Sequence, residues 1–366
     1  MNTVNVKQRI AARVAERNTW STYVPSTFRK GMKLISGKDN FFSEVILQKK
    51  LPSEKELDQI FPVMQVDFNV LREPDEASIQ STWIGHSTLL VQMSAWNIIT
   101  DPIFSSRCAP TQFMGPRRYR RPACTIRELF EKGIHIDVVL ISHNHYDHLD
   151  YASVKELAAL ALEMGHDIHF VVPLGVKAWF VSHVPDSFKK GNVVTEIDWH
   201  ESHIINDGAR PSLEITGLPM QHWSSRHGFD RDKSLWCGFG VKVMKNDDNE
   251  FMNFLFAGDT GYFHELESIG STYGPFHLAA IPIGAYEPRW FMKDEHADPD
   301  DAVKIMAAVR TQYAFPIHWG TFKLTPEPVL EPRDRLYSAL EKAKKDRNTF
   351  LASFIGETMT YPCLQI

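Results

Sequence analysis

The segment LISHNHYDHLD, residues 140–150, constrains the fold of this 366-residue chain more than any other feature. Directly after the apolar run DVVLIS, which is typical of a buried strand, come His143, His145, Asp147 and His148. Side chains at the end of a strand and the start of a helix converge on one point, and imidazole and carboxylate groups bind zinc or a similar divalent ion. The segment therefore predicts a metal site on a strand-to-helix turn.

The helix after this turn is predicted from YASVKELAALALEM, whose apolar residues recur at helical spacing. We expect it to begin near Ser153, with Ser153 and Glu156 as a capping box. Short apolar runs predict strands at 87–93, 96–104, 137–142, 168–173, 213–220, 237–244, 251–259, 278–284 and 313–319. Two further helices are expected at 299–310 and 332–346. Strands mixed with helices favour an α/β protein with one or two packed sheets.

Three later residues, each just past an apolar run, extend the predicted metal site: His222, Asp259 and His318. Ligand sites of α/β sheets lie along one edge, beyond the ends of the strands. Together with the first four residues they make seven candidate ligands, which exceeds the four of a tetrahedral site. The sequence thus predicts two divalent metal ions with Asp259 as the bridging carboxylate.

Composition narrows the class of protein. Hydrophobic residues make up 43% of the chain, and its formal net charge is −5. The four cysteines show no CxxC spacing, which argues against a disulfide framework or a thiolate site. We find no apolar run of the roughly 20 residues that span a bilayer and no signal-peptide segment. We therefore expect an intracellular, cytoplasmic protein.

Residues 1–50 form a basic arm, with ten Lys/Arg against three Asp/Glu, on an acidic remainder. Attraction to an anionic membrane surface is one interpretation, worth about 1 kcal/mol per basic residue. A solvated, charged helix face is the other main interpretation, and an organelle transit peptide is a third. We expect residues 1–75 to form a helical and irregular extension that packs on or beside a hydrolase domain at 76–366.

Longer motifs show a family resemblance. TWIGHSTLLVQM, TDPIFSSRCAPTQFMGPRRYRRPAC, SHNHYDHLD, FAGDTGY, GPFHLAAIPIGAYEPRWFMKDEHADP and IHWGTF resemble the N-acyl-phosphatidylethanolamine-hydrolysing phospholipase D family of the metallo-β-lactamase superfamily. The resemblance implies an αββα sandwich, with two mixed β-sheets flanked by helices, and a two-zinc centre. One metal would be held by His143, His145 and His222, and the other by Asp147, His148 and His318, with Asp259 between them.

The resemblance also implies a reaction, in which a metal-bridging hydroxide attacks a phosphodiester to release N-acylethanolamine and phosphatidic acid. Asp147 would orient the nucleophile, and His296 would bind the phosphate or protonate the leaving group. His86 is expected to be structural or to support the ligands. Candidate lipid contacts are Phe113, Met114, Tyr286, Trp290, Phe291 and Met292 for the acyl chain, and Arg117 and Arg118 of RRYRR for the phosphate. Core packing and structural ion pairs are alternatives for these two groups.

The implied partners are a phospholipid substrate and a membrane surface bound without spanning it, and a homodimer is expected. A same-fold hydrolase acting on another substrate, such as a sugar-phosphate lactone or another phosphodiester, is the main alternative. The acidic body argues against a nucleic-acid partner, because a groove that follows phosphates needs positive charge. A non-catalytic binding module is disfavoured, because all seven candidate ligands are present.

Overall fold

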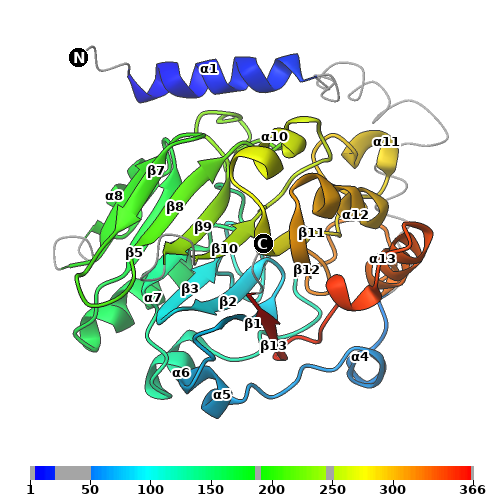
Figure 1. The fold of residues 1–366 in the computed structure, drawn as a ribbon, viewed down its shortest axis with the longest axis horizontal. Coiled ribbons are helices and arrows are strands. Elements are labelled where there is room, and N and C mark those ends of the chain that lie inside the picture. Colours follow the sequence, from blue (N-terminus) through cyan, green and yellow to red (C-terminus); the bar gives the residue numbers. More distant parts are fainter. Residues whose placement is uncertain (1–4, 21–50, 186–190, 245–250, 364–366) are drawn as a thin grey trace.

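Two mixed β-sheets pack face to face, with helices along their outer faces, in a computed structural model that describes residues 5–20, 51–185, 191–244 and 251–363 (Figure 1). This arrangement confirms the expected αββα sandwich. The first sheet has the order β13-β1-β2-β3-β4-β5-β6 and the second the order β12-β11-β10-β9-β8-β7. Each sheet contains both antiparallel and parallel pairs, for example β1 with β2 and β3 with β4 in the first.

The strands of the first sheet are β1 (Ser78–Gly85), β2 (Thr88–Met93), β3 (Trp96–Thr100), β4 (Val138–Leu140), β5 (His169–Pro173), β6 (Val193–Ile197) and β13 (Thr358–Pro362). Those of the second are β7 (Ser202–Ile205), β8 (Leu213–Leu218), β9 (Gly238–Met244), β10 (Phe251–Phe256), β11 (Phe276–Pro282) and β12 (Thr311–Ile317). The helices of the described residues are α1 (Val6–Thr19), α4 (Glu54–Ile60), α5 (Phe68–Arg72), α6 (Ile126–Glu131), α7 (Tyr151–Glu163), α8 (Lys177–His183), α10 (Glu265–Thr272), α11 (Arg289–Met292), α12 (Pro299–Ala308), α13 (Glu331–Lys342) and a 3-10 turn at Arg347–Thr349.

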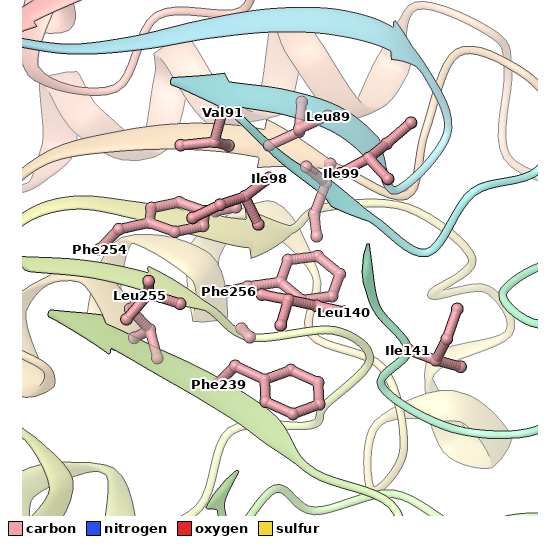
Figure 2. Packing of buried hydrophobic residues seen from close by; sticks show 14 of the residues in the cluster. Leu89, Val91, Ile98, Ile99, Leu140, Ile141, Phe239, Phe254, Leu255 and Phe256 are labelled. Carbon is pink, nitrogen blue, oxygen red and sulfur yellow. The ribbon is translucent and has the colours of Figure 1, made fainter. Parts of the chain in front are cut away.

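The core lies between the two sheets, as Figure 2 shows. Fully buried residues line both faces of β2 and β3 in the first sheet and of β9 and β10 in the second: Leu89, Val91, Ile98, Ile99, Phe239, Phe254, Leu255 and Phe256. Burial of each such side chain contributes about 1.5–3 kcal/mol. Strands β1 and β2 are buried along their whole length, because their outer faces are covered as well. This packing holds the ends of the strands, and the residues beyond them, in fixed positions.

An aromatic cluster closes the sandwich near the ends of β1 and β12. Trp83 stacks on Trp319 with ring centroids 5.2 Å apart, and Phe61 lies 5.1 Å from Trp319. The Trp83 indole N–H donates to the backbone carbonyl of His86 at 2.9 Å. His318 immediately precedes Trp319 in the chain, so the cluster packs beside two histidines of the predicted site.

The start of α7 differs from the prediction. The helix begins at Tyr151, and its N-cap is Asp150, whose carboxylate accepts from the backbone N–H of Ser153. The predicted capping box of Ser153 and Glu156 is therefore wrong. Ser153 instead donates its hydroxyl to Asp150, and an Asp cap satisfies the first N–H groups as well as a Ser cap.

The described parts of residues 1–75 pack on the sandwich. Ile10 and Trp20 near the two ends of α1 are buried, and so are Leu57 of α4 and Leu71 of α5. The basic residues between 29 and 50, with Tyr23 and Phe28, lie outside the described residues. Within the described ranges, no helix combines the length and the apolar character needed to cross a bilayer.

Candidate metal centre

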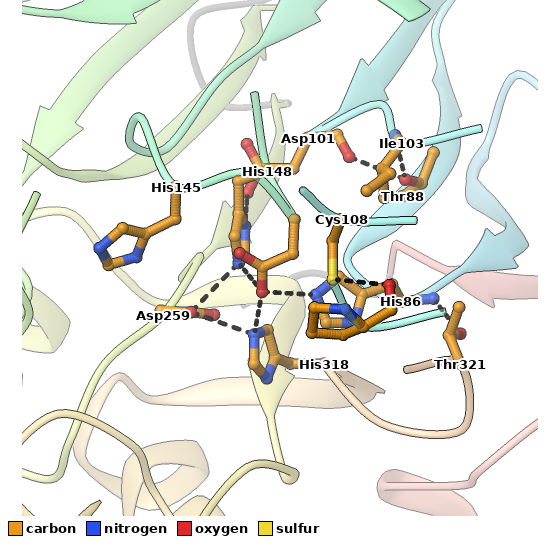
Figure 3. Close-up of polar contacts among 12 residues, drawn as sticks. His86, Thr88, Asp101, Ile103, Cys108, His145, His148, Asp259, His318 and Thr321 are labelled. Atoms are coloured by element: carbon orange, nitrogen blue, oxygen red, sulfur yellow. Dashed lines mark hydrogen bonds and ion pairs between the residues drawn. The ribbon is translucent and has the colours of Figure 1, made fainter. Parts of the chain in front are cut away.

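All seven predicted ligands meet at one end of the sandwich. His143, His145, Asp147 and His148 lie on the turn between β4 and α7, and the other three follow β8, β10 and β12. Figure 3 shows His148, Asp259 and His318 turned toward one another from these separate segments, with His145 to one side. Because the strand ends lie along one edge, residues up to 175 positions apart in the chain become neighbours.

Three histidines form one group of possible ligands. His143 Nε2 lies 2.7 Å from His145 Nδ1, and that atom lies 3.3 Å from His222 Nε2. The three ligand atoms all lie within 4.8 Å of one another. This is the trio expected to hold one metal ion.

A second group surrounds Asp259. Its Oδ2 lies 3.1 Å from Nε2 of both His148 and His318. Asp147 Oδ2 lies 3.4 Å from His148 Nε2 and 3.3 Å from His318 Nε2. Asp259 Oδ2 is also 3.9 Å from His143 Nε2, so this carboxylate stands between the two groups.

The charges of the centre fit bound cations. Burial opposes ionisation of Asp147 and Asp259, but the neighbouring His148 holds the pKa of each carboxyl well below its usual range. Burial opposes a charge on His148 as well, yet the carboxylates of Asp259, Asp147 and Asp101 raise its pKa well above the usual value. Buried negative charge of this kind requires positive charge beside it. A bound metal ion would supply that charge in place of the proton on His148.

Buried atoms without a hydrogen-bond partner give a second test of whether these residues suit a metal ion. Among the described residues, His148 Nε2 and Asp259 Oδ1 have no hydrogen-bond partner of good geometry. Buried polar atoms are otherwise almost always paired. These two atoms lie at the centre of the cluster, where a metal ion would give them a partner. The residues therefore fit a divalent metal site.

Neighbouring groups fix which nitrogen of each imidazole faces the centre. Asp101, which follows β3, accepts at 2.6 Å from His148 Nδ1 and at 2.6 Å from the Ser142 hydroxyl. Ser142 Oγ lies 2.9 Å from His143 Nδ1, and the Glu295 carbonyl lies 3.0 Å from His222 Nδ1. These partners place the proton on Nδ1 and leave the Nε2 lone pair free to bind a metal.

Asp101 was missed by the sequence analysis. The predicted strand at 96–104 placed Asp101 inside the strand, whereas β3 ends at Thr100 and Asp101 directly follows it. Burial raises the pKa of Asp101, while His148 and Ser142 act in the opposite direction.

His86 lies beside the centre, on the turn after β1. Its Nε2 is 3.1 Å from Asp147 Oδ2, and its side chain is buried. The position is consistent with a supporting role, in which the imidazole orients the Asp147 carboxylate.

His296 is brought into the centre from the segment between α11 and α12. Its Nδ1 lies 4.0 Å from Asp259 Oδ2, and its ring centroid is 5.1 Å from that of His222. Burial lowers the pKa of His296 to about 3, so the ring is neutral. The structure thus places this predicted catalytic residue next to both groups of ligands.

The candidate lipid contacts divide into exposed and buried residues. Phe113 and Met114 are 79% and 69% exposed, whereas Trp290, Phe291 and Met292 are half-buried. Tyr286 is fully buried, and its hydroxyl donates to Glu331 at 2.8 Å. Tyr286 therefore packs inside the protein, which corrects the expectation that it lines a groove.

Arg117 and Arg118, the candidate phosphate contacts, also differ in exposure and in their partners. Arg117 is exposed and remains available to a phosphate group. Arg118 donates to the backbone carbonyls of Ser105 and Ile103 at 2.9 and 2.7 Å and lies over the ring of Phe322. Its guanidinium therefore joins loop segments, and we do not retain it as a phosphate ligand.

Known proteins resemble this chain in sequence and in fold. The Beta-lactamase superfamily domain matches residues 96–319. N-acyl-phosphatidylethanolamine-hydrolyzing phospholipase D 1 of Caenorhabditis elegans is 38% identical over 88% of this chain and 87% of its own length. The mitochondrial protein of the same name from Saccharomyces cerevisiae is 32% identical over 78% of this chain and 56% of its own.

A metallo hydrolase of the archaeon Ignicoccus hospitalis shares the fold, with a TM-score of 0.53 and 22% identity over 78% of this chain and 98% of its own. The seven clustered ligands, the sandwich and these similarities agree. The chain therefore belongs to the β-lactamase superfamily and, within it, to the N-acyl-phosphatidylethanolamine-hydrolysing phospholipase D family.

Proposed function

We propose that this chain hydrolyses N-acyl-phosphatidylethanolamine to N-acylethanolamine and phosphatidic acid, as a metal-dependent phosphodiesterase of phospholipase D type. The observation that carries the proposal is the convergence of six other candidate ligand side chains around Asp259 in a member of this family. The proposal includes two divalent ions, and zinc suits the imidazole-rich set of ligands. The seven predicted residues would hold them in the two groups described above.

In the proposed reaction, water attacks phosphorus, the bond to the ethanolamine oxygen breaks, and that oxygen takes up a proton. When bound, two divalent ions lower the pKa of the attacking water and offset charge on the phosphoryl oxygens. Asp147, held by His86, would orient the water. His296 would donate an N–H of its neutral ring to a phosphoryl oxygen or to the leaving oxygen, because it lies beside Asp259 at the junction of the two groups.

A pocket beside the metal-binding turn supports a lipid substrate. It has a volume of about 280 Å³. Tyr146, Tyr151 and Trp179 line it together with small apolar residues, and polar or charged residues such as Asp150, His183 and Arg226 make up the rest of the lining. Tyr146 lies between His145 and Asp147 in the chain, so the pocket lies beside the metal-binding turn, although no predicted ligand lines it. An acyl chain would be stabilised there by burial of its methylene groups, at about 0.8 kcal/mol each.

Exposed apolar residues close to the pocket in sequence support action at a membrane surface. Phe113 and Met114 directly follow the pocket residue Gln112, and Phe229, which is 92% exposed, comes two positions after His227. We propose that these residues contact the lipid surface, so that the protein binds a membrane peripherally from the cytoplasm. The homodimer implied by the family resemblance stays a prediction, which analytical ultracentrifugation will check.

Product analysis tests the proposed function. Zinc-loaded protein and an Asp259→Asn variant are given N-acyl-phosphatidylethanolamine in mixed micelles, and lipids are identified by mass spectrometry. We expect N-acylethanolamine and phosphatidic acid from the wild type and neither from the variant. Hydrolysis of a generic phosphodiester without either lipid product would retain the metal centre and reject the lipid substrate, in favour of another phosphodiester or a lactone.

A further inference from the structure

The N-terminal helix α1 is joined to the body by a row of arginines. Arg9, Arg13 and Arg17 are four residues apart and so share one face of the helix. Arg9 and Arg13 donate to the carboxylate of Asp198 at 3.0 and 2.9 Å. In Figure 1 the helix lies across one end of the sandwich, above β7 and α10. Part of the basic arm is therefore neutralised by the acidic body.

Aromatic packing completes the attachment of α1. Trp20, at the C-cap of the helix, is 4% exposed and stacks between Trp199 and Phe263, with centroid distances of 5.6 and 4.5 Å. Ile10 is buried as well. The helix is thus held by burial of Ile10 and Trp20 and by the ion pairs of Arg9 and Arg13.

Arg17 differs from the other two arginines in its burial and its partners. It is 2% exposed, and its Nη1 donates to the backbone carbonyl of His222 at 3.0 Å. Its Nη2 forms an ion pair with Asp232 at 3.1 Å, and its guanidinium lies 4.8 Å from the ring centre of Trp236. A buried guanidinium with these partners is bound in one orientation.

The contacts of Arg17 converge on the segment that carries a predicted metal ligand. Trp236, beneath the guanidinium, donates its indole N–H to the carbonyl of Met220 at 2.7 Å. The carbonyls at 220 and 222 are therefore both bound, one by Trp236 and the other by Arg17. The His222 ring is oriented separately, through Nδ1 and the Glu295 carbonyl. Backbone and ring together determine where His222 Nε2 lies.

We propose that Arg17 is a positioning residue of the metal centre, through which α1 fixes His222 relative to His143 and His145. The proposal rests on the proposed metal-dependent function, since it assigns His222 as a ligand. Removal of the guanidinium leaves the His222 carbonyl and the Asp232 carboxylate without this donor in a buried region. Loss of an outer partner of a metal ligand typically costs 10–100-fold in metal affinity.

The test is metal binding by the full chain, measured without any lipid. Zinc affinity is determined by competition with a chromophoric chelator, and the visible spectrum of the cobalt-substituted protein reports ligand geometry. We compare Arg17→Met and Arg17→Lys with Arg13→Met. The last is the matched control, because Arg13 binds Asp198 and the carbonyl of Trp199 but not His222.

We expect Arg17→Met to weaken binding of one of the two metal ions by about 10-fold or more and to alter the cobalt spectrum. Arg17→Lys should restore part of the affinity, and Arg13→Met should stay within about 2-fold of the wild type. Wild-type affinity and an unchanged spectrum in Arg17→Met would overturn the proposal. If that variant does not fold, Arg17→Gln is measured in its place, with the same two outcomes.

The result is separable from the proposed function. A wild type that binds two metal ions but releases no N-acylethanolamine would reject the lipid substrate and leave the role of Arg17 standing. A wild type that binds no metal would overturn both.

Discussion

Replacement of Asp101 by Asn disrupts the hydrogen bonds of a buried carboxylate behind the predicted metal centre. The Asp101 carboxylate accepts from Ser142 N–H at 2.7 Å, from the Ser142 hydroxyl at 2.6 Å and from His148 Nδ1 at 2.6 Å. Oδ1 accepts from the Ser142 N–H, whereas Oδ2 accepts from both the Ser142 hydroxyl and His148 Nδ1. An Asn side chain must therefore place its NH₂ group against either the backbone N–H of Ser142 or the N–H of His148. Two donors would meet in a fully buried place.

The expected loss of zinc affinity follows from this contact between two hydrogen-bond donors. A hydrogen bond to a charged group contributes about 1.5–3 kcal/mol, and about 1.4 kcal/mol corresponds to a factor of ten in affinity. Alternatively, the His148 proton moves to Nε2, which removes the lone pair that faces Asp259. A clash with the His148 N–H or a shift of its proton should lower zinc affinity at the second group of ligands about 10–100-fold.

Chelator competition, with zinc content per chain, measures the effect. Asp137→Asn is the matched control, because Asp137 precedes β4 and is also buried, but binds Asn97 and Arg210. The control should keep wild-type zinc affinity. If Asp101→Asn binds both ions within about 2-fold of the wild type, the assignment of Asp101 as an essential partner of a ligand is refuted.

Three other predictions test catalysis, membrane contact and stability. His296→Ala should reduce turnover of N-acyl-phosphatidylethanolamine by about 100-fold or more while zinc content stays at the wild-type level, and equal turnover would remove its catalytic role. Exchange of Phe113 and Met114 for Ser should weaken binding to phospholipid vesicles in a sedimentation assay, with hydrolysis of a soluble phosphodiester unchanged; undiminished vesicle binding would contradict the membrane contact. Trp83→Ala should lower the free energy of unfolding by about 3–5 kcal/mol in chemical denaturation, because the fully buried ring leaves a cavity against Trp319. A loss below about 1 kcal/mol would show that the aromatic cluster repacks.

Local patterns, each spanning only a few residues, were sufficient to predict much of the fold. The apolar runs predicted most strands, and the 3.6-residue period predicted α7, α12 and α13 to within a few residues. The strand at 78–85 and the short helices α4, α5 and α6 were not predicted. A run such as SIQSTWIG is buried on both faces although half of it is polar, so its hydropathy does not signal a strand.

The sequence by itself was sufficient to predict the seven candidate ligands of the centre. Residues that follow buried strands lie at one edge of the sheets, so they come close together. His143, His222, Asp259 and His318 all follow this rule. Only the tertiary structure decided what stands behind those ligands. Arg17 and His222 are 205 residues apart, and Asp101 and His148 are 47 apart. Such contacts depend on how whole elements pack against each other, and no local pattern of residues encodes that packing.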